Sequence, residues 1–165
     1  MVRRIGWLFA VLVTMRAAVP LVAQGPEVGD VAPVVSVPDL DGKVVRLGVG
    51  AARHPVIIEF WATWCEVCRA LLPTMRAAQK QYGDRVDFYG VNVTVNERKE
   101  RVQQYVARNH PPFQTLYDER GAATRAFAAM ATSYVVIIDR TGRVAYTGEG
   151  SDQKILAELA KVTAK

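Results

Sequence analysis

The sequence has 165 residues and a mass of 18.2 kDa, enough for one well-packed domain and too short for two. Half of the residues are apolar and 22% are charged, which is typical of a globular protein. The formal net charge is +5, but three arginines lie in residues 1–23, which contain no acidic residue, and the other basic residues are scattered. This distribution excludes a basic patch for nucleic acid, so no nucleic-acid partner is expected.

Residues 1–23 have the pattern of an export signal. Two arginines near the start precede an uncharged run at residues 5–15, and a small residue, Ala23, ends the segment. The run is shorter than the roughly 20 apolar residues that a membrane span needs, and it fits a signal peptide. Leu21 is larger than the residue preferred before a cleavage point, so an uncleaved N-terminal anchor stays open. In both cases the domain is expected in the periplasm or another extracytoplasmic space.

The rest of the chain alternates between short apolar strands and amphipathic helices. Residues 24–33 suggest a linker or an extended lead-in, and Asp41–Gly42 predicts a tight hairpin turn. Strands are expected at Val34–Val37, Lys43–Leu47, Val56–Trp61, Val86–Val91, Phe113–Tyr117, Tyr134–Ile138 and Arg143–Thr147. Helices are expected at Arg69–Tyr82, Glu97–Asn109, Glu119–Met130 and from a cap at Asp152 to Val162.

This order of elements predicts one α/β domain over residues 34–165. Its parts are a central mixed β-sheet, helices on both faces and an N-terminal β-hairpin extension.

The chain has two cysteines, Cys65 and Cys68, and their spacing indicates redox chemistry. A bridge across two residues constrains the unfolded chain very little, so stabilisation is a poor reason for it. The pair follows a buried strand and opens a helix, whose unpaired N–H groups and dipole favour a thiolate. We therefore assign Cys65 as the nucleophile and Cys68 as the resolving thiol, one helical turn further on. Trp64 offers a flat apolar surface to a protein substrate.

Glu59 is the unusual residue of the strand that leads to the cysteines. A carboxyl group among Ile, Phe and Trp side chains is costly unless it is protonated or partnered. Desolvation should raise the pKa of Glu59, which suits a proton acceptor for the thiol of Cys68. The alternative is a residue at the rim of the sheet with its carboxylate in water.

The string from Phe60 to Cys68, FWATWCEVC, with Pro73 five residues later, resembles the thioredoxin superfamily. It is most similar to the exported TlpA/ResA-like thiol–disulfide oxidoreductases of the redoxin type, over residues 29–165. The resemblance implies the thioredoxin fold and a buried acid at Glu59. It also implies protein thiol or disulfide substrates such as apocytochrome thiols in cytochrome c maturation, and a membrane thiol as electron donor. No cofactor is expected beyond the Cys65–Cys68 disulfide, and the protein is expected to be a monomer.

Three positions depart from the pattern of that family. Val67 replaces the usual proline between the cysteines, and Leu71 stands where many members have a glutamate. Ser133, after Thr132, replaces the cis-proline that faces the cysteines and pairs with bound peptide. Because a cis bond before serine costs about 2.5–4 kcal/mol, we expect a trans bond there. Thr132 and Ser133 are the expected substrate contacts, and their change places substrate handling in question.

The direction of the reaction and the main alternatives rest on a few further residues. Glu66 adds negative charge beside Cys65, which opposes thiolate formation and favours the reducing direction. A c-type haem site is disfavoured because Arg69, not histidine, follows the second cysteine. A zinc site has only His54 and His110 to add, both far away in sequence. The main alternative is a non-enzymatic binding or chaperone-like module of the same fold with a structural disulfide.

Overall fold

The computed structural model describes residues 25–48 and 54–164, and the predicted export signal at residues 1–23 lies outside them. Five strands form one mixed sheet in the order β5-β4-β3-β6-β7, with β3, β4 and β5 parallel and β6 and β7 antiparallel. The strands are β1 (Val35–Pro38), β2 (Val44–Leu47), β3 (Val56–Trp61), β4 (Asp87–Asn92), β5 (Gln114–Tyr117), β6 (Tyr134–Ile138) and β7 (Val144–Gly148). The helices are α1 (Glu66–Tyr82), α2 (Lys99–Asn109), α3 (Ala122–Ala126) and α4 (Ile155–Thr163).

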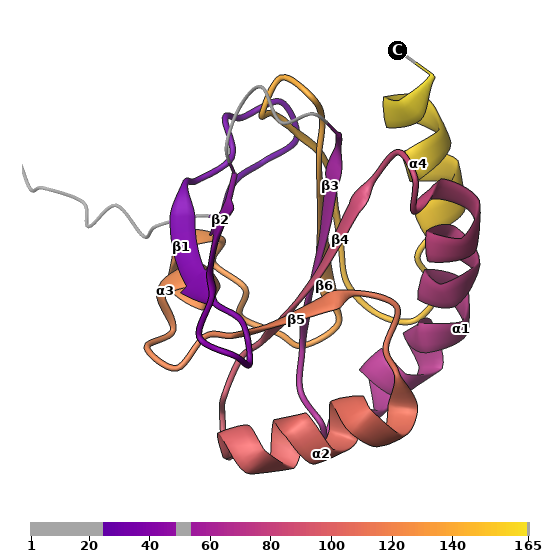
Figure 1. The fold of residues 1–165 in the computed structure, drawn as a ribbon. Helices are drawn as coiled ribbons and strands as arrows, with labels where there is room; N and C mark the ends of the chain where they lie inside the picture. The colour runs from indigo at the N-terminus through magenta and orange to yellow at the C-terminus, as the bar shows by residue number, and fades with distance from the viewer. Residues whose placement is uncertain (1–24, 49–53, 165) are drawn as a thin grey trace, which may run out of the picture.

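The sheet is covered on both faces, as Figure 1 shows. On one face α1 and α4 pack against alternate residues of the central strands, including Ile57, Val135 and Ile137. On the other face the β1–β2 hairpin and α3 cover Ile58 and Phe60. The expected mixed sheet with an N-terminal hairpin is therefore confirmed. Successive residues of β3 point to opposite faces and enter two different cores, which is why nearly every residue of this strand is apolar.

Residues 25–33, expected as a linker or lead-in, run beside the β6–β7 turn. The backbone N–H of Gly29 donates to Val144 O at 2.8 Å, and the N–H of Ala32 donates to Gly142 O at 2.9 Å. The side chain of Ala32 is buried in the core that lies between the sheet and the β1–β2 hairpin. The hairpin that follows is closed by Asp39, whose carboxylate accepts from the N–H groups of Asp41 and Lys43.

The predicted boundaries of α3 and α4 are wrong, and α1 begins at Glu66, three residues before the predicted Arg69. The helix expected at Glu119–Met130 is only α3, because the buried Asp118 carboxylate accepts from the N–H groups of Ala123 and Thr124 and starts the helix there. The backbone of Ala128 then takes a positive φ of 46° and ends it.

The last helix does not begin at a cap formed by Asp152. The N-cap of α4 is Lys154, without a side-chain hydrogen bond, and Asp152 contacts only the neighbouring Ser151. The intervening Gln153 donates to the carbonyls of Ser133 and Gly150, which holds the chain in a non-helical path until residue 154.

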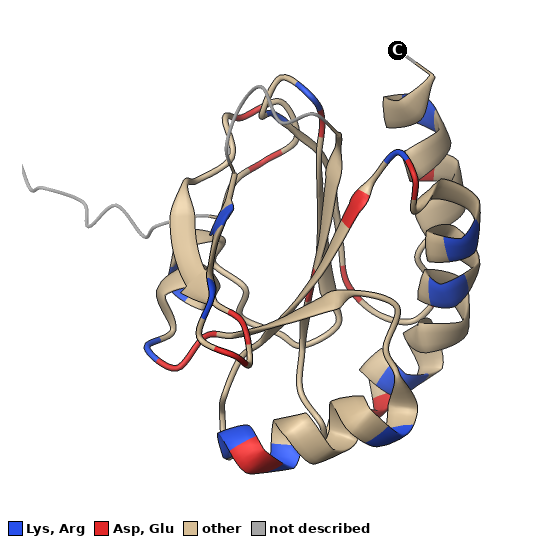
Figure 2. Ribbon diagram, in the orientation of Figure 1, with Lys and Arg blue, Asp and Glu red and all other residues tan. Residues whose placement is uncertain are grey.

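Charged residues lie mainly on α1, α2 and α4 and in the turns (Figure 2). The central strands carry few, and Glu59 is the one charged residue that is buried within β3. Over residues 25–48 and 54–164, none of the helices is long and apolar enough to cross a membrane.

Candidate active site

The turn between β3 and α1 places Cys65 at the first residue of a helix. The N–H of Cys65 donates to Ala62 O at 3.2 Å, and Cys65 has extended dihedrals as the N-cap of α1. Its Sγ accepts the N–H of Cys68 at 3.0 Å, so the sulfur caps the helix. This places the Cys65 sulfur where the helix dipole and an N–H donor stabilise negative charge.

The two cysteines form a disulfide bond. The S–S distance is 2.07 Å and the Cα atoms are 5.3 Å apart, which is the normal range for a disulfide. Both cysteines are almost completely buried, at 3% and 4% exposure. The structure is therefore that of the oxidised protein.

Exposed apolar side chains lie next to the cysteines in the chain and around a hollow that Trp64 lines. Trp64 and Val67 are each 45% exposed, and Met130, in the loop after α3, is 92% exposed. Trp64 and Met130 both line a hollow of about 400 Å³. It is lined by Trp64, Val93, Val95, Thr124, Ala129, Met130, Ala131 and Thr132. Trp64 and Thr132, two of the three expected substrate contacts, thus face the same hollow.

Glu59 is buried on the α1 side of the sheet. It is 1% exposed and follows the alternation of Ile57, which packs in the core with Leu71 and Met75 of α1. Its Oε2 atom has no hydrogen-bond partner in the described part of the chain. Burial raises the pKa of Glu59 from 4.5 to about 8. The alternative of a rim residue with a solvated carboxylate is therefore wrong.

The neighbourhood of Glu59 on the next strand is apolar. Its register partner on β4 is Gly90, which in a parallel pair points to the same face. A Cβ atom added to Gly90 would lie 2.2 Å from the ring of Phe113, so that ring occupies the place of a side chain beside Glu59. Phe113 also packs against Trp61, with ring centroids 5.7 Å apart.

Ser133 is buried and turned inward. No peptide bond in the described ranges is cis, so the expected trans bond at Ser133 is confirmed. Ser133 has a positive φ of 63°, its N–H donates to Phe60 O at 2.7 Å, and its hydroxyl donates to Gly150 O. Its carbonyl accepts from Gln153. Because all these groups are used internally, the half-buried Thr132 is the residue of this pair that can meet a substrate.

Sequence reasoning missed two polar residues beside the cysteine turn, Asn92 and Glu97. The carboxylate of Glu97 accepts from the N–H of Thr63 at 2.8 Å and from the Thr63 hydroxyl. Its other oxygen accepts from the side-chain amide of Asn92, which is fully buried. Their position at and just after the carboxyl end of a predicted parallel strand could have indicated them, because the active sites of such sheets lie at that edge.

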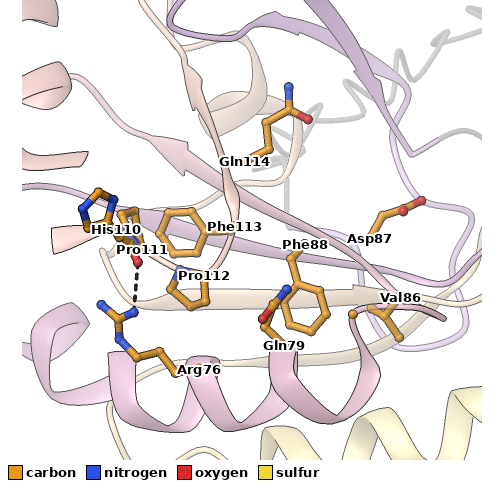
Figure 3. A pocket seen from close by; sticks show the side chains of 11 residues that line it. Arg76, Gln79, Val86, Asp87, Phe88, His110, Pro111, Pro112, Phe113 and Gln114 are labelled. Atoms are coloured by element: carbon orange, nitrogen blue, oxygen red, sulfur yellow. Dashed lines mark hydrogen bonds between the residues drawn. The ribbon is translucent and has the colours of Figure 1, made fainter. Parts of the chain in front are cut away.

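A second hollow, of about 540 Å³, lies apart from the disulfide (Figure 3). Its lining includes Arg76 and Gln79 of α1 and the segment His110–Gln114, and the Arg76 guanidinium donates to His110 O at 2.9 Å. His54 precedes β3 and lies 3.6 Å from Asp87, so the length of the strand separates it from Cys65. Within the described ranges no cluster of three potential metal ligands occurs.

A disulfide that caps the helix after the central strand of a mixed sheet defines the class of thioredoxin-fold thiol–disulfide oxidoreductases. The family model of the Redoxin family matches residues 27–164. The chain therefore belongs to the Redoxin family, and its TlpA/ResA-like resemblance is confirmed.

Individual relatives agree with this assignment. The chain is 32% identical to the thioredoxin-like protein YneN of Bacillus subtilis over 119 residues, 72% of this chain and 69% of the relative. It is 26% identical to the thiol-disulfide oxidoreductase ResA of Bacillus thuringiensis over 142 residues, covering 83% of this chain and 79% of the relative. It spans only 25% of the rice chloroplastic thioredoxin-like protein HCF164, with 37% identity over 65 residues. The solution structure of a putative thioredoxin from Neisseria meningitidis superposes with a TM-score of 0.69 at 27% identity, covering 81% of this chain and 90% of that one.

Proposed function

We propose that the protein reduces protein disulfides outside the cytoplasm through the Cys65–Cys68 dithiol. The observation that carries this proposal is the Cys65 sulfur at the N-terminus of α1, bonded to Cys68, with exposed apolar side chains next to the two cysteines in the chain. The export pattern of residues 1–23 supports the extracytoplasmic location, with the segment either cleaved or kept as an anchor.

The first step is attack by the Cys65 thiolate on a substrate disulfide. A bond forms between the Cys65 sulfur and one substrate sulfur, the substrate S–S bond breaks, and the second substrate sulfur leaves as a thiolate and takes a proton. The N–H of Cys68 and the dipole of α1 stabilise the attacking thiolate, which raises the fraction of Cys65 in the reactive, deprotonated form at neutral pH.

The second step releases the substrate. Cys68 loses its proton and attacks the Cys65 sulfur, so that the Cys65–Cys68 bond forms and the mixed disulfide breaks, and the substrate sulfur that was bound to Cys65 leaves as a thiolate and takes a proton. The substrate has then gained two electrons and two protons, and the enzyme holds the disulfide seen in this structure. With a pKa of about 8, Glu59 populates both protonation states near neutral pH, so it is suited to accept the Cys68 proton.

The substrate site that we propose is the hollow beside Trp64. Its lining is largely apolar, and the backbone N–H and C=O of Thr132 have no partner within the described ranges. An extended substrate segment can therefore pair with the backbone of Thr132 and place an apolar side chain between Trp64 and Met130. The client proteins are those with a disulfide in such an exposed, extended segment.

The reducing direction rests on the charge near Cys65. Glu66 is in the first turn of α1, and its exposed carboxylate pairs with Arg69 at 3.2 Å. A carboxylate next to the nucleophile makes the thiolate less stable and the dithiol a better reductant. Turnover then requires a dithiol donor, and a membrane thiol protein is the donor that an exported or anchored enzyme can reach.

The test uses the full chain with its N-terminal segment, a Cys68→Ser variant and a Cys65→Ser variant. We expect the wild-type protein to catalyse insulin-disulfide reduction by dithiothreitol, and Cys68→Ser to accumulate mixed disulfides that dithiothreitol releases. Cys65→Ser should do neither. If wild-type Cys65 exchanges no faster than a model thiol at pH 7, the protein is instead a binding module with a structural disulfide. The inward-turned Ser133 is the observation that favours this second candidate.

A further inference from the structure

The loop between β4 and α2 holds the turn that precedes the nucleophile. Glu97 in this loop receives the N–H of Thr63 at 2.8 Å and the hydroxyl of the same residue. The next residue, Trp64, donates its indole N–H to Val95 O at 2.9 Å. Two consecutive residues directly before Cys65 are therefore fixed by one loop that lies about 30 residues further along the chain.

The carboxylate of Glu97 is itself held in place. Its second oxygen accepts from the amide of Asn92, and the amide oxygen of Asn92 accepts the N–H of Thr94 at 3.0 Å. The hydroxyl of Thr94 donates to Asp118 O at 3.2 Å, which ties the loop to the end of β5. Thr94 and Asn96 both have positive φ angles, of 59° and 55°. A backbone with two such residues needs these contacts to keep its shape.

This arrangement has two effects on Cys65. Orientation of the Ala62–Thr63 peptide by Glu97 sets the turn whose Ala62 O accepts the N–H of Cys65, and so keeps Cys65 at the N-cap of α1. The same contact holds the Glu97 carboxylate against Thr63, which is two residues before the nucleophile in the chain. Its negative charge opposes a thiolate on Cys65 in the same way as any neighbouring carboxylate.

We propose that Glu97 is a positioning residue that anchors the Cys65 turn and, by its charge, keeps the Cys65–Cys68 pair reducing. This inference rests on the disulfide exchange of the proposed function, and it assigns the reducing character to one carboxylate outside the cysteine motif. The charge of Glu66 also favours the reducing direction, but Glu66 is exposed and paired with Arg69. Glu97 is only partly exposed and is tied to the turn by hydrogen bonds.

The experiment compares two substitutions that act on this contact with opposite electrostatic effect. Glu97→Gln removes the charge and can still accept from Thr63. We expect the pH midpoint of Cys65 alkylation to fall by roughly 0.5 to 1 pH unit, and the equilibrium constant with glutathione to move roughly threefold to tenfold towards easier reduction of the protein disulfide. Thr63→Val removes the hydroxyl that donates to Glu97, so the charge of the Glu97 carboxylate is less well neutralised. The pH midpoint of Cys65 alkylation should therefore rise in this variant.

Three controls separate this proposal from a loss of structure. Glu97→Asp keeps the charge and should stay within about twofold of the wild type. Glu100→Gln changes an exposed carboxylate in the first turn of α2 and should leave both values unchanged. Circular dichroism and thermal melts show whether each variant folds. If Glu97→Gln does not fold, the predicted rise of the Cys65 alkylation midpoint in Thr63→Val still tests the proposal.

Two results would overturn the inference. One is a Glu97→Gln variant with wild-type midpoint and equilibrium constant. The other is a shift of Glu97→Gln and Thr63→Val in the same direction, because that would reflect loosening of the turn and not the charge. A wild-type protein whose Cys65 does not exchange at all would instead contradict the proposed function, so the two failures are distinguishable.

Discussion

The ring of Phe113 occupies the space above Gly90, and Gly90 is the register partner of Glu59. An apolar ring thus lies where another protein could place a cation or a polar partner for the carboxyl group. Phe113 also lines the hollow of about 540 Å³ drawn in Figure 3, so it stands between Glu59 and that solvent-open space. The raised pKa of Glu59 has burial as its cause, and this ring supplies part of that burial.

Shortening Phe113 should therefore lower the pKa of Glu59. In Phe113→Ala we expect a decrease of about one unit, because solvent from the neighbouring hollow gains access to the carboxyl group. Phe113→Leu keeps most of the apolar volume and serves as the matched control. Carboxyl ¹³C NMR titration gives the value directly, with Glu59→Gln to assign the signal. An unchanged pKa in Phe113→Ala would contradict this role.

The raised pKa of Glu59 also makes stability depend on pH. The folded protein holds a proton up to about pH 8 that the unfolded chain releases near pH 4.5, so stability falls as pH rises through this window and then levels off. Glu59→Gln lacks this penalty. We expect its stability advantage over the wild type to grow by about 2.5 kcal/mol between pH 5 and pH 7.

Urea unfolding at a series of pH values measures that difference. The matched control is Glu119→Gln, since Glu119 is exposed and its substitution should give a constant offset. A stability difference between Glu59→Gln and the wild type that stays flat from pH 5 to pH 8 would show that Glu59 ionises normally in the folded protein.

The catalytic role proposed for Glu59 predicts a specific kinetic defect. If the carboxylate accepts the proton of Cys68, Glu59→Gln should slow release of the mixed disulfide by about 100-fold or more at pH 7. The initial attack by Cys65 should change little. Rapid-quench analysis separates the two steps, and the defect should shrink as pH approaches the pKa of the Cys68 thiol. Equal slowing of both steps would indicate a general disturbance of the site.

The two positions where the family carries proline should respond differently to its introduction. Val67 is in the first turn of α1 and 45% exposed, so Val67→Pro should change stability by no more than about 1 kcal/mol. Ser133→Pro should cost about 3 kcal/mol or more, because proline cannot adopt the positive φ of residue 133 and lacks the N–H that Phe60 O accepts.

Thermal and urea unfolding of the two variants provide the comparison. Ser133→Ala keeps the N–H and loses only the hydroxyl bond to Gly150, so it should cost about 1 kcal/mol. Wild-type stability in Ser133→Pro would mean that the loop after α3 can rearrange, and that the inward position of Ser133 is not the only stable one.

Features that depend on neighbours in the sequence could be predicted before the structure. The strand with Glu59, the turn after it and the helix opened by Cys65 and Cys68 are contiguous, and both the period-2 pattern and the helix start are local properties. Burial of Glu59 followed from its apolar neighbours. The ends of α3 and α4 could not be read in this way, since Asp118 and Gln153 fix them through contacts that helical periodicity does not encode.

The fold class, the cysteine pair and the buried acid could be predicted from the sequence alone, because each follows from residues within one strand, turn and helix. Three features could be seen only in the folded protein: Glu97 holds Thr63, Phe113 covers the neighbour of Glu59, and the polar groups of Ser133 are hydrogen-bonded inside the domain. The physical reason is the sheet: the parallel pairing of β3 and β4 brings residues 92–97 beside the cysteine turn, and strand order and register are set by packing of the whole domain.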